Sequence, residues 1–157
     1  MSAQPDELYS LLIPLQGEKL LAPRACVAEV IAFIEPERSD EKGEYPDWYI
    51  GRVDWSGRRL PVVSFEGMSG EETKKRAGRS RIVVFHALGE EFPGGYYGVI
   101  TQGFPQLVRV NADVLSADLE RPWPEEQPAL CRAHMINEFP LIPDMERLEA
   151  MLLEIIS

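Results

Sequence analysis

The chain has 157 residues, 45% of them hydrophobic, which is enough for one domain with a substantial core. It carries 26 acidic residues against 16 Lys and Arg, a net charge of -10. Because a phosphate backbone would be repelled over most of such a surface, we expect no nucleic-acid partner.

The start of the chain indicates a cytoplasmic protein without membrane insertion. Residues 1–7 are polar and acidic and lack the basic segment that opens a signal peptide. No later apolar run approaches the roughly 18 residues that a membrane span needs. The apolar runs 8–15 (LYSLLIPL) and 19–23 (KLLAP), with Gly17 between them, then predict a β-hairpin.

The next segments predict further strands and a charged loop. Residues 26–34 (CVAEVIAFI) fit a strand or a short helix, and their length slightly favours the strand. Residues 35–47 are dense in charge, with proline and glycine, as expected of an exposed loop. Residues 59–65 predict a strand, and Pro61 belongs at its start or on a sheet edge because proline donates no ladder hydrogen bond.

The second half repeats this pattern and ends in a helix. Residues 66–80 are polar and mark a boundary between two β-rich halves, 8–65 and 81–142. A hairpin is expected where a glycine-rich turn joins two apolar runs. The expected elements are strands at 81–88, 96–101, 107–110, 129–136 and 140–142, an irregular segment at 116–128, and a helix over 144–156 with Asp144 as its N-cap.

Few residues offer catalytic or metal chemistry. Cys26 and Cys131 lie far apart, which suits reduced thiols better than a disulfide. A zinc site needs three or four closely spaced ligands, and only Cys131 and His134 are close in sequence. On a strand, a separation of three residues sends those side chains to opposite faces, so they make a poor nucleophile and base. His86 alternates with Val84 and is expected to be half-buried. We expect no catalytic residue, metal or cofactor.

Residues 48–65 (WYIGRVDWSGRRLPVVSF) describe a strand, a tight glycine turn and a second strand. They resemble the Gly-Val-Ile-Asn-Leu-Arg-Gly turn and Pro-Val-Ile-Asp-Leu strand of CheW-like proteins, adaptors that couple chemoreceptors to the chemotaxis histidine kinase. Residues 27–31 (VAEVI) are similar to the family's Val-x-Glu-Ile-Ile segment, and 81–84 with 98–107 to its second-half hairpin. The resemblance covers about residues 8–152 in the same order. The positions in register around the turn are Gly51, Val53, Gly57, Pro61, Val62 and Val63.

The resemblance implies two packed SH3-like, five-stranded β-barrels that share a core, with a C-terminal helix. It implies a single CheW-like domain over 8–152, with barrel halves at roughly 8–65 and 81–142. The implied function is a non-enzymatic adaptor between the cytoplasmic tip of a chemoreceptor and the regulatory domain of a CheA-type histidine kinase.

The chain departs from the family at several charged positions. In the family, a Glu and the Arg before the turn glycine belong to the receptor-coupling surface. This chain keeps Glu29 but has Ser56 in place of the Arg, and Arg58 has the right strand parity to pair with Glu29 instead. Trp55 suits an exposed anchor and a half-buried cover equally well. The lost charges indicate a divergent member, of a pilus-linked or other accessory chemosensory system, so the pathway served is chemotaxis or twitching motility.

The expected receptor surface lies in the groove between the barrels. Its expected partner-binding residues are Val27, Glu29, Val30, Trp55, Ser56, Arg58, Ile100 and Phe104. Two other classes of function remain open: a stand-alone β-barrel that binds a peptide or small molecule, and a hydrolase that uses Cys131 or His134.

Overall fold

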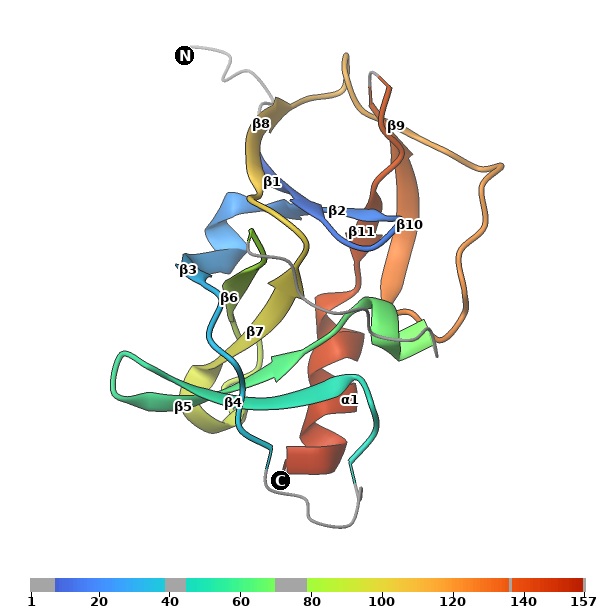
Figure 1. The fold of residues 1–157 in the computed structure, drawn as a ribbon. Helices are drawn as coiled ribbons and strands as arrows, with labels where there is room; N and C mark the ends of the chain where they lie inside the picture. The colour runs from blue at the N-terminus through green and yellow to red at the C-terminus, as the bar shows by residue number, and fades with distance from the viewer. Residues whose placement is uncertain (1–7, 39–44, 70–78, 136, 157) are drawn as a thin grey trace.

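A computed structural model describes residues 8–38, 45–69, 79–135 and 137–156 (Figure 1). These residues are mostly β, with one α-helix near the C-terminal end, so the predicted fold class is confirmed. The elements before residue 70 are β1 (Leu8–Pro14), β2 (Lys19–Pro23), η1 (Arg24–Cys26), β3 (Val27–Ala32), β4 (Tyr49–Trp55), β5 (Arg58–Val63) and η2 (Glu66–Ser69), where η marks a 3-10 helix. The later elements are β6 (Arg81–His86), η3 (Pro93–Gly95), β7 (Tyr96–Thr101), β8 (Gln106–Val110), β9 (Ser116–Ala117), β10 (Ala129–His134), β11 (Leu141–Pro143) and α1 (Met145–Ile156).

The strands form two sheets that correspond to the two barrels. One has the order β8-β1-β2-β11-β10-β9 and the other the order β3-β6-β7-β5-β4. The strands do not divide between the sheets at the boundary expected from sequence (Figure 1). Strands β1 and β2, from the first half of the chain, lie between β8 and β11 in the first sheet. Strands β6 and β7, from the second half, lie between β3 and β5 in the second sheet. Each barrel therefore contains segments from both halves of the chain.

Pro61 is placed differently from the prediction. It lies inside β5, which is paired with β4 on one side and β7 on the other, so it is neither at the strand's start nor on an edge strand. The register explains how the sheet tolerates it: β7 pairs only with Val62 and Val63, one residue beyond the proline. A ladder hydrogen bond toward β7 is therefore not needed at Pro61.

Alternating side chains give the protein three cores. In β6, Ile82 and Val84 point into the second barrel, whereas Val83 and Phe85 point into a larger core shared by both barrels and α1. Strand β1 alternates in the same way, since Leu12 belongs to the small core of the first barrel and Ile13 belongs to the shared core. Strands β6 and β7 of the second sheet are thus buried on two faces, which is why they contain nearly continuous apolar runs.

The second barrel closes where the chain after β3 crosses β4. Glu37 and Arg52 exchange two backbone hydrogen bonds of 2.8 Å each. Gly51, beside this bridge, has φ 142°, and a Cβ there would lie 2.5 Å from the Glu37 carbonyl oxygen. Gly51 therefore serves the backbone, because no side chain fits at this crossing.

Helix α1 begins at the predicted cap. Oδ1 of Asp144 accepts the Arg147 backbone N–H at 3.1 Å, and Leu148 and Leu152 are buried in the shared core. Glu149 is also buried, although it is charged. Its two oxygens accept the N–H groups of Leu88 and Gly89, at 2.6 and 3.1 Å, so the helix holds the loop after β6 in place.

Candidate functional site

The turn between β4 and β5 presents a compact polar tip. Ser56 and Gly57 both have positive φ, 49° and 76°, the combination that a two-residue hairpin turn requires. Both residues are exposed. Ser56, which stands where the family has Arg, therefore presents only a short hydroxyl group.

Trp55 and Glu29 join the two edge strands of the second sheet. The indole Nε1 of Trp55, at the end of β4, donates to Oε1 of Glu29 on β3 at 3.0 Å. The ring is half-buried and packs against the core of the second barrel. Trp55 is therefore a cover over this end of the barrel rather than a fully exposed anchor.

Arg58 lies over Tyr96. Its guanidinium carbon is 5.0 Å from the centre of the Tyr96 ring, and Nη1 donates to the Gly94 carbonyl oxygen at 3.3 Å. No ion pair joins Arg58 to Glu29 among the residues that the structure describes, although the sequence suggested one. Strand β7 begins at Tyr96 and lies next to β5, whereas β3 is separated from β5 by β6 and β7. Arg58 on β5 therefore contacts the Tyr96 ring and not Glu29 on β3.

The remaining predicted residues separate into two places. Val27 and Val30 are half-buried and pack against the shared core, on a different face of β3 from its neighbours Ala28 and Ile31, which face the second barrel. Phe104 is 66% exposed, beyond the end of β7. Ile100 is only 3% exposed inside the second barrel, so its predicted role as a partner contact is wrong: its side chain faces the barrel interior.

Further apolar side chains follow Phe104 on one face of the first sheet. Leu107 on β8 is paired with Leu11 on β1, and Arg109 is paired with Tyr9, so these four side chains lie on one face. Leu11 packs against the shared core, whereas Tyr9 and Leu107 are 50% and 52% exposed. We call Phe104, Leu107, Leu11 and Tyr9 the inter-barrel strip.

Sequence reasoning missed most of this strip. Tyr9 and Leu107 were assigned to strands, but which face of those strands is exposed depends on the β1–β8 pairing across about a hundred residues. Arg81 was also missed, although its guanidinium carbon lies 4.0 Å from the centre of the Phe104 ring. The local sequence gives no signal for either contact.

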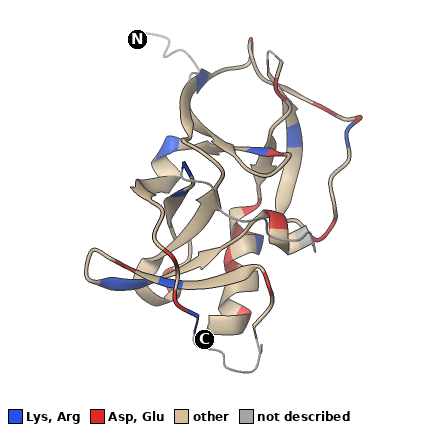
Figure 2. Ribbon diagram, in the orientation of Figure 1, with Lys and Arg blue, Asp and Glu red and all other residues tan. Residues whose placement is uncertain are grey.

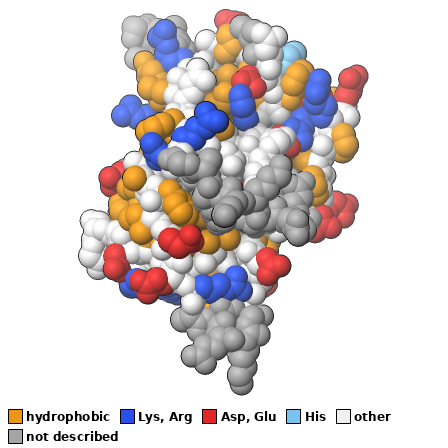
Figure 3. Space-filling model, in the orientation of Figure 1, with side chains coloured by type: hydrophobic (Ala, Val, Ile, Leu, Met, Phe, Trp, Pro, Cys, Tyr) orange, Lys and Arg blue, Asp and Glu red, His pale blue; other side chains and the backbone are white. Residues whose placement is uncertain are grey.

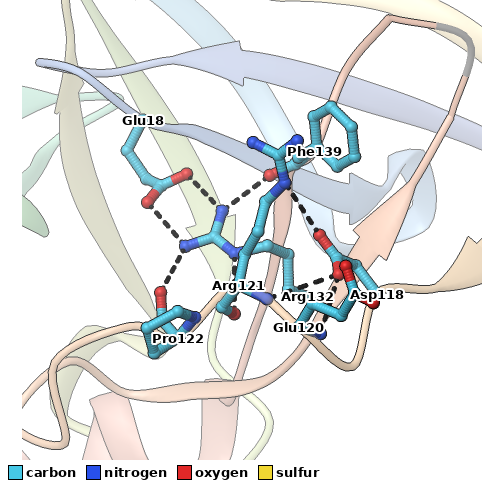
Figure 4. A network of polar contacts seen from close by, with 7 residues as sticks. All are labelled: Glu18, Asp118, Glu120, Arg121, Pro122, Arg132 and Phe139. Carbon is cyan, nitrogen blue, oxygen red and sulfur yellow. Dashed lines mark hydrogen bonds and ion pairs between the residues drawn. The ribbon is translucent and has the colours of Figure 1, made fainter.

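A surface hollow of about 590 Å³ lies beside the first barrel and is lined by paired charges. Arg132, 6% exposed, donates to both carboxylate oxygens of Glu18 at 2.8 and 3.0 Å and to the Phe139 carbonyl at 2.7 Å (Figure 4). The bond to Glu18 raises the pKa of Arg132 above its ordinary value. Arg121, over the Phe139 ring at 3.4 Å, pairs with Asp118 at 3.1 Å. Because these charges satisfy one another, the network fixes the loop before β10 rather than offering a ligand site.

The cysteine and histidine residues lie in ordinary surroundings. Cys131 is exposed, and the His134 ring stacks on Phe139 with centroids 4.6 Å apart. His86 is exposed against Tyr96, not half-buried as expected. Within the described ranges, no three His, Cys, Asp or Glu residues are arranged to hold a metal ion. Nor does any helix in those ranges have the length and apolar character needed to cross a membrane.

Comparisons with known proteins agree with this architecture. The sequence profile of the CheW-like domain matches residues 10–150. No curated protein matches the chain. Among solved structures, the scaffolding protein TtCheW from Thermoanaerobacter tengcongensis aligns with a TM-score of 0.72 at 15% identity, over 91% of this chain and 88% of that one. At this identity the likeness shows a shared fold of two β-barrel subdomains.

Proposed function

The chain belongs to the CheW-like domain family, and we propose that it is a non-enzymatic adaptor that couples a chemoreceptor to a CheA-type histidine kinase. The solved protein of the same fold is described as a scaffolding protein, which supports a role in assembly. The proposal places the protein in the cytoplasm, with one surface for the receptor tip and another for the regulatory domain of the kinase.

The inter-barrel strip is the observation that carries the receptor part of this proposal. Phe104 and Leu107 are large apolar residues exposed by more than half, and Leu11 of the strip packs against the same shared core as Val27 and Val30. Contiguous apolar surface of this kind is typical of protein interaction sites. The cluster of Glu29, Trp55 and Arg58 is tied to its own barrel by hydrogen bonds and ring contacts, so we place it at the margin of the site.

The test is binding of the purified chain to two separate partners, measured by titration calorimetry. One is the isolated regulatory domain of a CheA-type kinase, and the other a cytoplasmic fragment of a chemoreceptor, both from the same organism as the chain. We expect both to bind. Phe104→Ala is expected to weaken receptor binding by roughly tenfold, the effect of losing about 1.4 kcal/mol at an interface anchor.

Leu119→Ala is the matched control, because Leu119 is 93% exposed in the loop after β9 and lies outside the inter-barrel strip. It should leave receptor binding unchanged. Failure of the wild-type chain to bind either partner would reject the adaptor proposal, and equal effects of the two variants would reject the strip as the receptor site.

A further inference from the structure

The first barrel is open along one side. Its sheet ends in the edge strands β8 and β9, which face each other across the top of the view in Figure 1. Among the described residues, no backbone hydrogen bond joins β8 to β9 or to β10. The second barrel, by contrast, is closed between its edge strands by the bridge of Glu37 and Arg52. We call the unpaired side of the first barrel, between β8 and β9, the seam.

The interior of the first barrel is also incompletely filled. In the described part of the chain, the second barrel's own core holds six buried residues, whereas the core of the first barrel holds three. Further apolar side chains that pack against those three stay partly exposed, namely Val108, Leu115, Met135 and Ile142. Solvent therefore reaches apolar side chains that in a closed barrel would be buried.

Two hollows lie along the seam. One, of about 380 Å³, is lined by Val108 and Arg109 of β8 and by Val114 and Met135. The other, of about 250 Å³, is lined by residues 112–116, His134 and Met135. Because they share Val114 and Met135, the two hollows are adjacent, and we call them together the seam pocket.

A hydrogen-bonded turn closes one end of the seam pocket. Oδ1 of Asn111 accepts the backbone N–H groups of Asp113 and Val114 at 2.8 and 3.3 Å. The Asn111 carbonyl oxygen accepts those of Val114 and Leu115 at 3.2 and 3.0 Å. Because this turn joins the two edges of the seam, a strand inserted between β8 and β9 would run into it. The pocket is therefore better suited to a compact molecule than to an added strand.

The residues around the pocket favour an uncharged ligand. Strands β1, β8 and β9 carry a single charged residue, and the ribbon around the first barrel is mostly tan in Figure 2. Hydrophobic side chains and a histidine reach the surface at the top of the molecule (Figure 3). A charged ligand would lose water against Val108, Val114 and Met135 without a buried counter-charge. The flexible thioether of Met135, which lines both hollows, makes favourable contacts with aromatic rings.

We propose that the seam pocket binds a small, uncharged, mostly apolar molecule of about the size of two fused aromatic rings. A cavity of roughly 150 Å³ is enough for benzene, so the larger hollow has room for a second ring. The rings would lie against Val108 and Met135, with a polar group directed toward His134. The inference does not rest on the adaptor proposal, since Val108 lies on the other face of β8 from Leu107 of the inter-barrel strip.

The probes are 2-naphthol, 2-naphthoate and 2-(aminomethyl)naphthalene, which share one ring system and are neutral, anionic and cationic at neutral pH. Binding to the full chain is followed by NMR of the Met, Val and Leu methyl groups. We expect 2-naphthol to bind with a dissociation constant of about 0.1–1 mM and the charged probes roughly threefold more weakly or worse. The methyl signals of Val108, Val114 and Met135 should shift, and those of Val83 and Leu148 in the shared core should not.

Val108→Trp should weaken 2-naphthol binding by about tenfold or more, because the added indole would occupy the larger hollow. Val114→Trp is a second variant with the same expected effect, and its site is 36% exposed, so the fold is expected to tolerate it. Leu130→Trp is the matched control, since it adds the same side chain at a 63% exposed position of β10 that lines neither hollow. It should leave binding unchanged.

Absence of saturable 2-naphthol binding, tighter binding of either charged probe, or equal affinities in the three Trp variants would each overturn the inference. A seven-residue peptide of alternating Val and Thr is measured alongside, and tighter binding of this peptide in the seam would assign it to an added strand instead. Saturable 2-naphthol binding by a chain that binds neither the receptor fragment nor the kinase domain would reject the adaptor proposal and keep the inference.

Discussion

Gly51 and Gly57 are both glycines of the family turn motif, but the structure gives them different physical roles. At Gly51 the chain after β3 crosses so closely that a Cβ would lie 2.5 Å from a carbonyl oxygen. At Gly57, with φ 76°, a Cβ would meet nothing within 4 Å. The first glycine is required by contact and conformation together, and the second by conformation alone.

Gly51→Ala is therefore expected to lower the free energy of unfolding by about 3 kcal/mol or more, because the crossing at Glu37 must move. Gly57→Ala, the control, should cost about 1–2 kcal/mol, the ordinary penalty of left-handed backbone. Urea unfolding followed by circular dichroism measures both. Equal costs would show that the backbone crossing yields without strain.

Arg132 and Arg121 differ in burial, and we expect their contributions to stability to differ accordingly. Replacing it with Met leaves the Glu18 carboxylate without its partner and frees the Phe139 carbonyl, so we expect a loss of about 3 kcal/mol in unfolding free energy. Arg121 is 56% exposed, and its partner Asp118 still accepts the backbone N–H groups of Glu120 and Arg121, so Arg121→Met should cost only about 1 kcal/mol. Similar losses from both variants in the same urea assay would contradict the central role of Arg132.

At the scale of elements, the edge strands β3 and β4 carry the part of the site that the sequence foresaw least accurately. Parity along β5 suggested that Arg58 would meet Glu29, but parity says only which face a residue occupies, not which strand lies beside it. In the structure β5 lies next to β7, and Trp55 reaches Glu29 instead. The hairpins, by contrast, were predictable because their alternation and turn glycines are local.

The difference between local sequence signals and the pairing of distant strands also explains which other predictions were correct and which were wrong. The cap at Asp144 was predicted correctly because a few adjacent residues determine it. Ile100 was assigned to the wrong environment because the partner of its face, the interior of the second barrel, is assembled from distant strands. The exposure of Tyr9 and Leu107 likewise follows from pairing between β1 and β8, for which the local pattern holds no information.

A double-mutant cycle on the edge strands tests the new assignment. Trp55→Phe and Glu29→Met are expected to show a coupling of about 0.5–1 kcal/mol in unfolding free energy, because each removes the same hydrogen bond. Arg58→Gln and Glu29→Gln should be additive, since no direct contact joins them. If coupling appeared only between Arg58 and Glu29, the ion pair expected from sequence would be correct and the Trp55–Glu29 assignment wrong.

At the scale of the whole molecule, the shared core makes the two barrels depend on each other. Tyr97 of β7 is fully buried there, with Phe85 and Phe92 against its ring and its hydroxyl 3.8 Å from the sulfur of Met145 in α1. Burial, with a smaller contribution from the charge of Glu149, raises the pKa of Tyr97 far above its ordinary value. The hydroxyl thus stays protonated in the folded protein where the unfolded chain ionises.

This raised pKa predicts a loss of stability at alkaline pH. Below about pH 10, the ordinary pKa of tyrosine, neither state ionises and the contribution of Tyr97 is complete. Above it, the unfolded chain loses the proton first, so the free energy of unfolding falls by up to about 1.4 kcal/mol per pH unit from this group. Tyr97→Phe should show a shallower decline between pH 9 and 11 in urea unfolding. An identical slope in both proteins would exclude this linkage.

The shared core also predicts that the barrels unfold together. Leu20 of the first sheet and Val99 of the second both face it, whereas the core of the first barrel alone holds only Leu12, Leu21 and Val110 as buried residues among those described. So small a core cannot keep the first barrel folded once the second has opened, because its burial offsets too little chain entropy.

A single variant on either side of the shared core should therefore lower one common transition. Leu20→Ala is expected to cost about 2–5 kcal/mol. The midpoint should fall equally when unfolding is followed by tryptophan fluorescence in a Trp123→Phe background, which reports Trp48 and Trp55 near the second sheet, and by circular dichroism of all strands. If the fluorescence midpoint stays at its original value while the circular dichroism splits into two steps, the barrels unfold independently. A single shifted midpoint means that the two barrels unfold as one cooperative unit, so a change in the stability of one barrel is felt by the other.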